Sequence, residues 1–300
     1  MKVYFSAEYT AAKYSFDTTR KSRDVALSLF DRPIDGVKLV KPKRLGSKQL
    51  LLAHDANYVD AVLTGQPKDL AESQGFSWDP GLWTSVTASS AGMVRAALEA
   101  LQTGVAGTLS SGLHHARRDL GAGFCTFNGL ALAAKYALRE PGVERVLIVD
   151  FDAHCGGGTE SIIRDNGRII QVDVSTDDFD AYQSTPTAQL KLVDNPDRYL
   201  SECGAALSRA DRLGSYDLVL YNAGMDPHED CIVGGLQGVT REILAARERL
   251  VFQWAALRGH PIAFALAGGY TSALLPVDDL VDLHRLTVLA AAEHAALATV

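Results

Sequence analysis

The sequence has no long hydrophobic run and no excess of basic charge, and each absence excludes a class of protein. No stretch of about 18 uninterrupted apolar residues is present, so a membrane span is not expected. The net charge of −7 argues against a nucleic-acid-binding surface as the main role. We therefore expect neither a membrane nor a nucleic acid among the partners of this chain.

Paired cysteines and processing signals are also missing. The four cysteines are scattered, and none of them forms the CxxC pair of a zinc finger or a redox motif. The N-terminal "MKVYFSAEYT" lacks the long apolar segment of a signal peptide. These features predict a cytoplasmic protein with reduced thiols, and they leave its oligomeric state open.

The residues that are present predict an α/β fold with a large core. Of the 300 residues, 47% are hydrophobic and 22% are charged, as in ordinary globular proteins. Six β-rich runs alternate with six helix-patterned segments. The runs are 2–6, 105–110, 145–152, 168–174, 217–222 and 261–267, and the segments are 84–103, 128–140, 157–165, 197–213, 239–257 and 278–295.

The later β-rich runs, such as "RVLIVDFD" and "DLVLYNAG", are almost continuously apolar, as in strands buried on both faces of a parallel sheet. Strands that alternate with helices form right-handed βαβ units. No Pro/Gly/Ser-rich linker interrupts the alternation. We therefore predict one domain over residues 1–300, with a doubly wound, mostly parallel sheet flanked by helices.

Polar residues follow four of the predicted strands at the point where each strand ends. In open α/β sheets, ligands bind beyond the carboxyl ends of the strands, so these side chains should converge. They are His114, His115, Asp150, Asp152, His154, Asp226 and Tyr270.

Three of these side chains have the chemistry of a metal site. Asp152 and His154 are two residues apart on an extended segment, so they share one face. Asp226 from another strand end could complete a site of three ligands, and an open fourth position is typical of catalytic zinc. The alternative is that Asp152 and His154 merely cap a turn.

The order of the motifs resembles the histone deacetylase family, which includes bacterial acetylpolyamine and acetoin-utilisation proteins and shares the arginase/deacetylase fold. The motifs are HH, GFC, DxDxH with a glycine-rich turn and Thr, GxD, and GGY, and the similarity runs from about Leu51 to the "LHRLTV" segment. The resemblance implies a zinc-dependent amidohydrolase that removes an acetyl or other short acyl group from an amine. The amine is either a protein lysine or a small molecule.

The resemblance also assigns roles to single residues. It implies zinc ligation by Asp152, His154 and Asp226. It implies that His115 is the general base and acid, that Asp150 holds His114 as an electrostatic partner, and that Tyr270 binds the carbonyl oxygen. It places Gly123 and Phe124 in the wall of an acyl-lysine-like tunnel. Family members often bind potassium near the matching aspartates, although Asp173 stands about where a serine ligand is common.

The sequence departs from the family pattern beside the active-site histidines. Gly157 stands where many members have an Asp or Asn that contacts the second histidine, so His115 is expected to lack a partner, with a lower pKa and a looser orientation. Cys155 stands where a second histidine is usual. Because adjacent residues on an extended segment point to opposite faces, Cys155 is interpreted as a buried neighbour rather than a ligand.

Two segments that we expect to border the substrate entrance also differ. An "HPE"-like segment is replaced by "DTTRKSRDVALSL", and the loop "STDDFDAYQSTPT" lacks a glycine-rich run. The loop acids Asp177, Asp178 and Asp180 could attract a cationic amine, but solvated loop acids are the simpler interpretation.

Two alternative functions remain at this point. An arginase-like ureohydrolase with two manganese ions needs bridging carboxylates, yet Gly156 and His228 occupy the matching positions. A non-catalytic acyl-amine sensor would be expected to lose metal ligands or the tyrosine, and this sequence retains them. The sequence therefore favours a mononuclear deacetylase.

Overall fold

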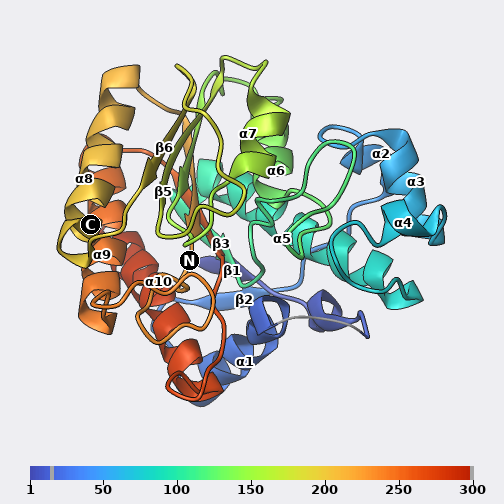
Figure 1. The fold of residues 1–300 in the computed structure, drawn as a ribbon. Coiled ribbons are helices and arrows are strands. Elements are labelled where there is room, and N and C mark those ends of the chain that lie inside the picture. Colours follow the sequence, from blue (N-terminus) through green and yellow to red (C-terminus); the bar gives the residue numbers. More distant parts are fainter. Residues whose placement is uncertain (14–16, 298–300) are drawn as a thin grey trace.

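A computed structural model describes residues 1–13 and 17–297 of the chain. Eight strands form one parallel sheet in the order β2-β1-β3-β8-β7-β4-β5-β6 (Figure 1). The strands are β1 (Lys2–Tyr4), β2 (Lys38–Val40), β3 (Val105–Thr108), β4 (Val146–Asp150), β5 (Ile169–Ser175), β6 (Ala188–Leu192), β7 (Leu218–Ala223) and β8 (Ile262–Leu266).

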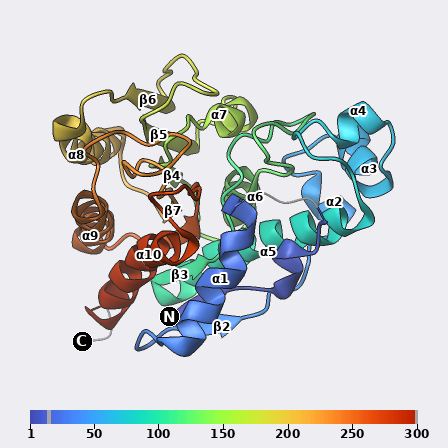
Figure 2. The same cartoon turned by 60° about the horizontal axis from the view of Figure 1, so that its bottom comes forward.

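Helices cover both faces of this sheet (Figures 1 and 2). One face carries α1 (Asp17–Asp31), α8 (Pro196–Leu213), α9 (Arg241–Arg258) and α10 (Val277–Leu297), and the other carries α5 (Pro80–Thr103), α6 (Gly129–Ala137) and α7 (Gly157–Ile163). The shorter elements are η1 (Ala7–Thr10), α2 (Ser47–Leu50), α3 (Ala56–Thr64) and α4 (Lys68–Ala71). None of the helices in the described ranges is both long and apolar enough to cross a membrane.

The core consists of two hydrophobic clusters, one on each face of the sheet. Strand β4 contributes to both, because successive side chains of a strand point to opposite faces. Leu147 and Val149 lie in the cluster on the sheet face that α8 and α9 cover. Val146 and Ile148 lie in the cluster on the opposite face, which α5 and α6 cover. This double burial explains why the strand reads as a continuous apolar run.

The predicted fold class is confirmed, and the sheet is parallel throughout. Each of the six predicted β-rich runs overlaps an observed strand, with β5 and β7 ending one residue beyond their runs, and each helix-patterned segment contains or overlaps an observed helix. The sequence analysis missed β2 and β6, which form the two edges of the sheet and are partly exposed. It also gave no boundaries for α1.

The four strands that carry the predicted chemical residues are neighbours in the order β3-β8-β7-β4. Because the strands are parallel, their carboxyl ends lie at one edge of the sheet. The loops that follow these four strands therefore meet at one place.

Candidate active site

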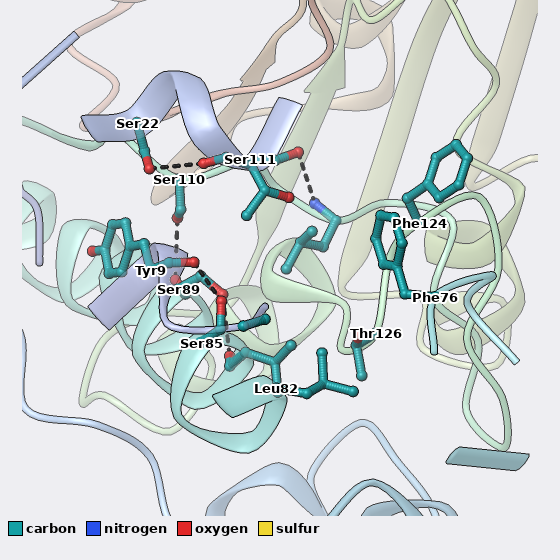
Figure 3. Close-up of a pocket in the computed structure, with 14 residues that line it drawn as sticks. Tyr9, Ser22, Phe76, Leu82, Ser85, Ser89, Ser110, Ser111, Phe124 and Thr126 are labelled. Atoms are coloured by element: carbon teal, nitrogen blue, oxygen red, sulfur yellow. Dashed lines mark hydrogen bonds between the residues drawn. The ribbon is translucent and has the colours of Figure 1, made fainter. Parts of the chain in front are cut away.

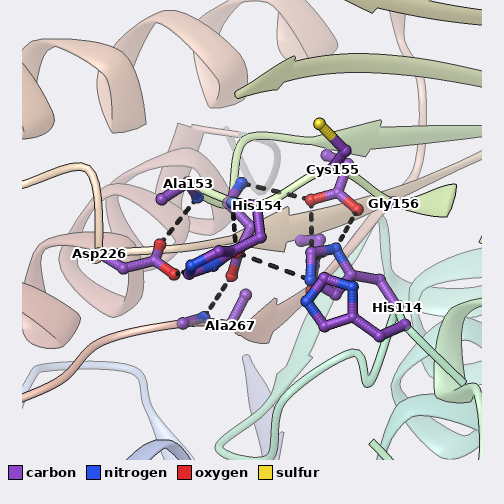
Figure 4. A network of polar contacts seen from close by, with 12 residues as sticks. His114, Ala153, His154, Cys155, Gly156, Asp226 and Ala267 are labelled. Carbon is purple, nitrogen blue, oxygen red and sulfur yellow. Dashed lines mark hydrogen bonds and ion pairs between the residues drawn. The ribbon is translucent and has the colours of Figure 1, made fainter. Parts of the chain in front are cut away.

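Asp152, His154 and Asp226 form a buried cluster whose potential ligand atoms all lie within 4.8 Å of one another. His154 Nδ1 lies 3.2 Å from Asp226 Oδ2 (Figure 4) and 3.1 Å from Asp152 Oδ1. A tetrahedral ion with ligand bonds of about 2.0 Å separates its ligand atoms by about 3.3 Å. The three side chains are thus spaced as the ligands of one small cation would be.

Backbone amides orient the two carboxylates of the cluster and leave one oxygen without a hydrogen bond. Asp152 accepts from the amides of His154 (3.0 Å) and Gly268 (2.5 Å), and Asp226 Oδ1 accepts from the amide of Ala153 (2.9 Å). Asp226 Oδ2 is buried and accepts no hydrogen bond, although His154 Nδ1 is near. A buried carboxylate oxygen without a donor is costly, and a cation at this position would satisfy it. The donor set therefore fits a metal ion.

Gly268 of the GGY motif allows the two carboxylates to approach the end of β8. A Cβ atom at this position would lie 1.8 Å from Asp226 Oδ2 and 2.6 Å from Asp152 Oδ2. Any side chain at this position would displace both acids. The motif predicted from the sequence thus has a steric role at the cluster.

His114 and Asp150 form the predicted pair. His114 Nδ1 donates to Asp150 Oδ2 over 2.8 Å, and Asn222 Nδ2 donates to Asp150 Oδ1 over 2.9 Å. Burial disfavours the charged ring, but the carboxylates of Asp150 and Asp152 outweigh it and raise the pKa of His114 to about 10. The sequence analysis missed Asn222, although its polar side chain ends an otherwise apolar run.

His115 has a carboxylate partner, so the expectation drawn from Gly157 is wrong. Its Nδ1 donates to Asp180 Oδ2 over 3.0 Å, and Asp180 comes from the loop that follows β5. The pKa of His115 is lowered to about 4, and the sequence analysis had predicted a lower value. The causes, however, are burial and the neighbouring His114 rather than the lack of a carboxylate partner. The Asp180 carboxylate opposes this shift.

A cavity of about 330 Å³ leads to the cluster. Its wall contains the predicted tunnel residues Gly123 and Phe124, together with Phe179 and Val233, which the sequence analysis missed. The Phe179 ring packs edge-on against His115 at 4.9 Å between centroids. The loop without a glycine-rich run therefore borders the entrance, as expected, and supplies an aromatic wall.

Tyr270 lies in the wall of the same cavity. Its side chain is mostly buried, and its ring centroid is 6.0 Å from that of His154. Burial and the carboxylates of Asp226 and Asp152 raise the pKa of Tyr270 far above its ordinary value. The hydroxyl is therefore protonated at neutral pH and can donate a hydrogen bond.

The three loop acids and Cys155 have different environments. Asp178 is exposed as expected, and Asp177 lines the cavity. The side chain of Asp180 is buried, so the interpretation of Asp180 as a solvated acid is wrong. Cys155 is fully buried, and its thiol contacts the carbonyl oxygen of Asp177 at 3.4 Å. Its interpretation as a buried neighbour is confirmed.

A second, smaller cavity of about 40 Å³ shares Phe124 with the first one (Figure 3). Several hydroxyl groups line it, among them those of Ser22, Ser89 and Ser110. Ser22 belongs to α1, and Lys21 beside it donates to the carbonyl oxygen of Ala267. Thr19 and Ser22 of the "DTTRKSRDVALSL" segment thus line the smaller cavity and not the larger one, whose entrance we expected the segment to border.

Residues 16–278 match the family profile described as the histone deacetylase domain. The chain belongs to the histone deacetylase family. An uncharacterized protein of Picosynechococcus sp. is 31% identical over 87% of both chains, and histone deacetylase 2 of Arabidopsis thaliana is 26% identical over 91% of this chain and 74% of its own length.

A solved structure shows the same fold as this histone deacetylase family member. Acetylpolyamine aminohydrolase from Burkholderia pseudomallei superposes with a TM-score of 0.79 over 97% of this chain and 98% of its own, at 19% identity. The similarity confirms the arginase/deacetylase-like architecture.

Proposed function

We propose that this histone deacetylase family member is a zinc-dependent amidohydrolase that removes an acetyl or other short acyl group from an amine, with residues 1–300 acting as one catalytic domain. The observation that carries the proposal is the buried Asp152–His154–Asp226 cluster, in which one carboxylate oxygen accepts no hydrogen bond, beside an aromatic-walled cavity. Family membership supports the reaction class. The cytoplasmic location stays a prediction.

Asp152, His154 and Asp226 would hold the zinc ion. The bound ion would lower the pKa of water towards about 7 and polarise the amide carbonyl. The His115 ring is neutral at pH 7 because its pKa is about 4, so it can accept the proton of the attacking water and return it to the leaving amine.

Two further groups would stabilise the charge that develops on the carbonyl oxygen. The protonated Tyr270 hydroxyl is placed in the cavity wall, and a preorganised donor of this kind contributes about 3 kcal/mol to transition-state stabilisation. The His114 ring, held by Asp150, adds a positive charge beside the cluster.

The proposed substrate is a linear acylated amine, which would occupy the cavity that Phe124 and Phe179 line. Both a protein acetyl-lysine and a small acetylated amine have this shape, and an acetylpolyamine aminohydrolase shares the fold.

We also propose a potassium ion as a second cofactor. Asp173, near Asp150, already accepts from the Gly156 amide (2.7 Å) and the Ser175 hydroxyl (2.7 Å), so this part of the proposal rests on the resemblance alone.

Metal content and amine release test the proposal together. We expect about one zinc ion per chain by mass spectrometry, with chelator-sensitive amine release from acetyl-lysine peptides, acetylpolyamines or small acetylamides. The Asp226→Ala variant should lose zinc and activity together. Two manganese ions per chain, or no metal after reconstitution, would contradict the proposal and favour the ureohydrolase or the sensor.

A further inference from the structure

We infer that Asp180 is the positioning residue for His115, and that Gly157 is the position that makes room for it. The inference rests on the proposed function, since it concerns the residue proposed as general base. It assigns a role to the loop between β5 and β6, 23 positions along the chain from Gly157, where many members of the family have an Asp or Asn.

The Asp180 carboxylate has a full set of donors. Its Oδ2 accepts from His115 Nδ1 at 3.0 Å and from the Gly158 amide at 2.9 Å, and its Oδ1 accepts from the Arg117 guanidinium. Its side chain is only 5% exposed. A buried carboxylate is stable when it is paired and fully hydrogen-bonded, as here. The contact with His115 is therefore part of a buried hydrogen-bond network around the Asp180 carboxylate.

The backbone of the loop directs this side chain inward. Asp180 has a φ of 60°, a left-handed conformation that aspartate adopts more readily than most residues. The Phe179 carbonyl accepts from the Cys155 amide at 3.0 Å, which ties the loop to the segment that follows the proposed ligand His154. The loop is thus fixed to the active site on both sides of the Phe179–Asp180 peptide.

Gly157, the first residue of α7, faces this loop directly. A Cβ atom at Gly157 would lie 2.2 Å from the Asp180 carbonyl oxygen and 2.7 Å from Asp180 Oδ1. No side chain fits there while Asp180 holds its place. The space that an acidic side chain at position 157 would need is filled by the acid at position 180.

The contact also sets the tautomer of His115. A neutral imidazole has one donor and one acceptor nitrogen, and the hydrogen bond made by one determines the state of the other. With Nδ1–H donated to Asp180, the lone pair is on Nε2, the nitrogen available to a reactant in the cavity. Without Asp180, the ring loses both this tautomeric preference and its orientation.

Asp180→Asn and Asp180→Ala test the role, with Asp178→Asn as the matched control in the same loop, because Asp178 is exposed. We expect kcat to fall 10- to 100-fold in both Asp180 variants, in line with the loss of a group that orients an active-site histidine, while KM and zinc content change little. The control should retain the wild-type kcat.

Gly157→Ala provides an independent test, since it removes no polar group. The added Cβ should displace Asp180 and lower kcat to a similar extent, again with zinc retained. Full activity of Gly157→Ala, or kcat values of the Asp180 variants within twofold of the control, would overturn the inference.

Nitrogen-15 NMR of the histidine rings separates this inference from the proposed function and from misfolding. In the zinc-loaded wild-type protein, the His115 ring should be protonated at Nδ1, whether or not any acetylamide is hydrolysed. An Nε2-protonated ring would contradict the inference even if the enzyme were an active deacetylase. Loss of the Nδ1–H signal in Asp180→Asn, with an unchanged melting temperature, would support it.

Discussion

At the scale of single residues, the aspartates of the site differ in their hydrogen-bond partners and are therefore suited to different roles. Asp150 is paired with His114 and Asn222, and Asp180 is paired with His115 and Arg117, so each fixes a histidine. Asp226 has one buried oxygen that accepts no hydrogen bond and lies 3.2 Å from His154 Nδ1. The first two acids are therefore suited to orient rings, and the third is suited to bind a cation.

Tyr270→Phe is the residue-scale prediction that isolates the proposed oxyanion donor. The ring is mostly buried, so phenylalanine should keep the packing while removing only the hydroxyl. We expect full zinc content and a kcat lowered by about 100- to 1,000-fold, as for loss of one oxyanion donor. Steady-state kinetics beside metal analysis provides the measurement, with Tyr136→Phe, on α6 and not among the residues that line the cavity, as the control. Unchanged turnover on an acetylamide would rule out the oxyanion role.

At the scale of elements, α9 holds together the two loops that carry the proposed metal ligands. Arg247 is fully buried and donates to the carbonyl oxygens of Phe151 (3.0 Å) and Gly224 (2.6 Å), one residue before Asp152 and two residues before Asp226. It also pairs with the buried Glu248 at 2.7 Å. One guanidinium thus links the ends of β4 and β7 to a helix on the face of the sheet.

Arg247→Met should therefore destabilise the fold and loosen the metal site. The variant leaves the buried Glu248 carboxylate without its cationic partner, and breaking such a pair costs about 3–5 kcal/mol of unfolding free energy. Urea denaturation should report this loss, and competition with a chelator should report weaker zinc binding. Arg249→Met, two residues along the same helix and exposed, is the control. Equal stability of the two variants would contradict the bracing role.

His54 connects the start of α3 to the loop between β3 and α6, and it predicts a pH-dependent stability. Its Nδ1 lies 2.8 Å from the Arg117 carbonyl oxygen, and its Nε2 accepts from the Asn128 amide at 3.0 Å, so the neutral ring fits both partners. Burial lowers the pKa of His54 to about 4. The unfolded chain, with an ordinary pKa of about 6.5, binds the proton more tightly.

The contribution of neutral His54 should therefore be present above pH 6.5 and be lost as the pH falls towards 4. The free energy of unfolding is expected to be about 2 kcal/mol lower at pH 5 than at pH 7 from this group alone. Denaturation of wild type and His54→Gln at both pH values measures the difference. An equal pH dependence in the two proteins would show that His54 is not the group responsible.

At the scale of the whole molecule, the sequence predicted what depends on periodicity and topology. Strands such as β4 and β7 are apolar on both faces, and the parallel sheet brings their ends together, so Asp152, His154 and Asp226 could be expected to meet. The edge strands β2 and β6 are partly exposed and carry no such signal.

The contributions of Phe179 and Asp180 could not be predicted in this way. Both depend on the path of the loop after β5, including one left-handed residue, and no period in the sequence reports that path. The sequence showed that position 157 lacks the acidic or amide side chain of many family members. It did not show that Asp180 takes its place, because the conformation of the loop after β5 is defined only in the folded protein. A loop that departs from the family pattern can therefore supply a different residue for the same role in the site.

The close approach of Gly157 and Asp180 has a consequence for the history of this site. An acid at both positions would place two carboxylates in the same small volume, and an acid at neither would leave His115 without support. A change from one arrangement to the other by single substitutions would then pass through an intermediate protein in which His115 is poorly supported. The alternative is that both positions change in close succession. We expect homologous sequences to fall into two groups, each with one acid and a small residue at the other position, with few intermediates between them.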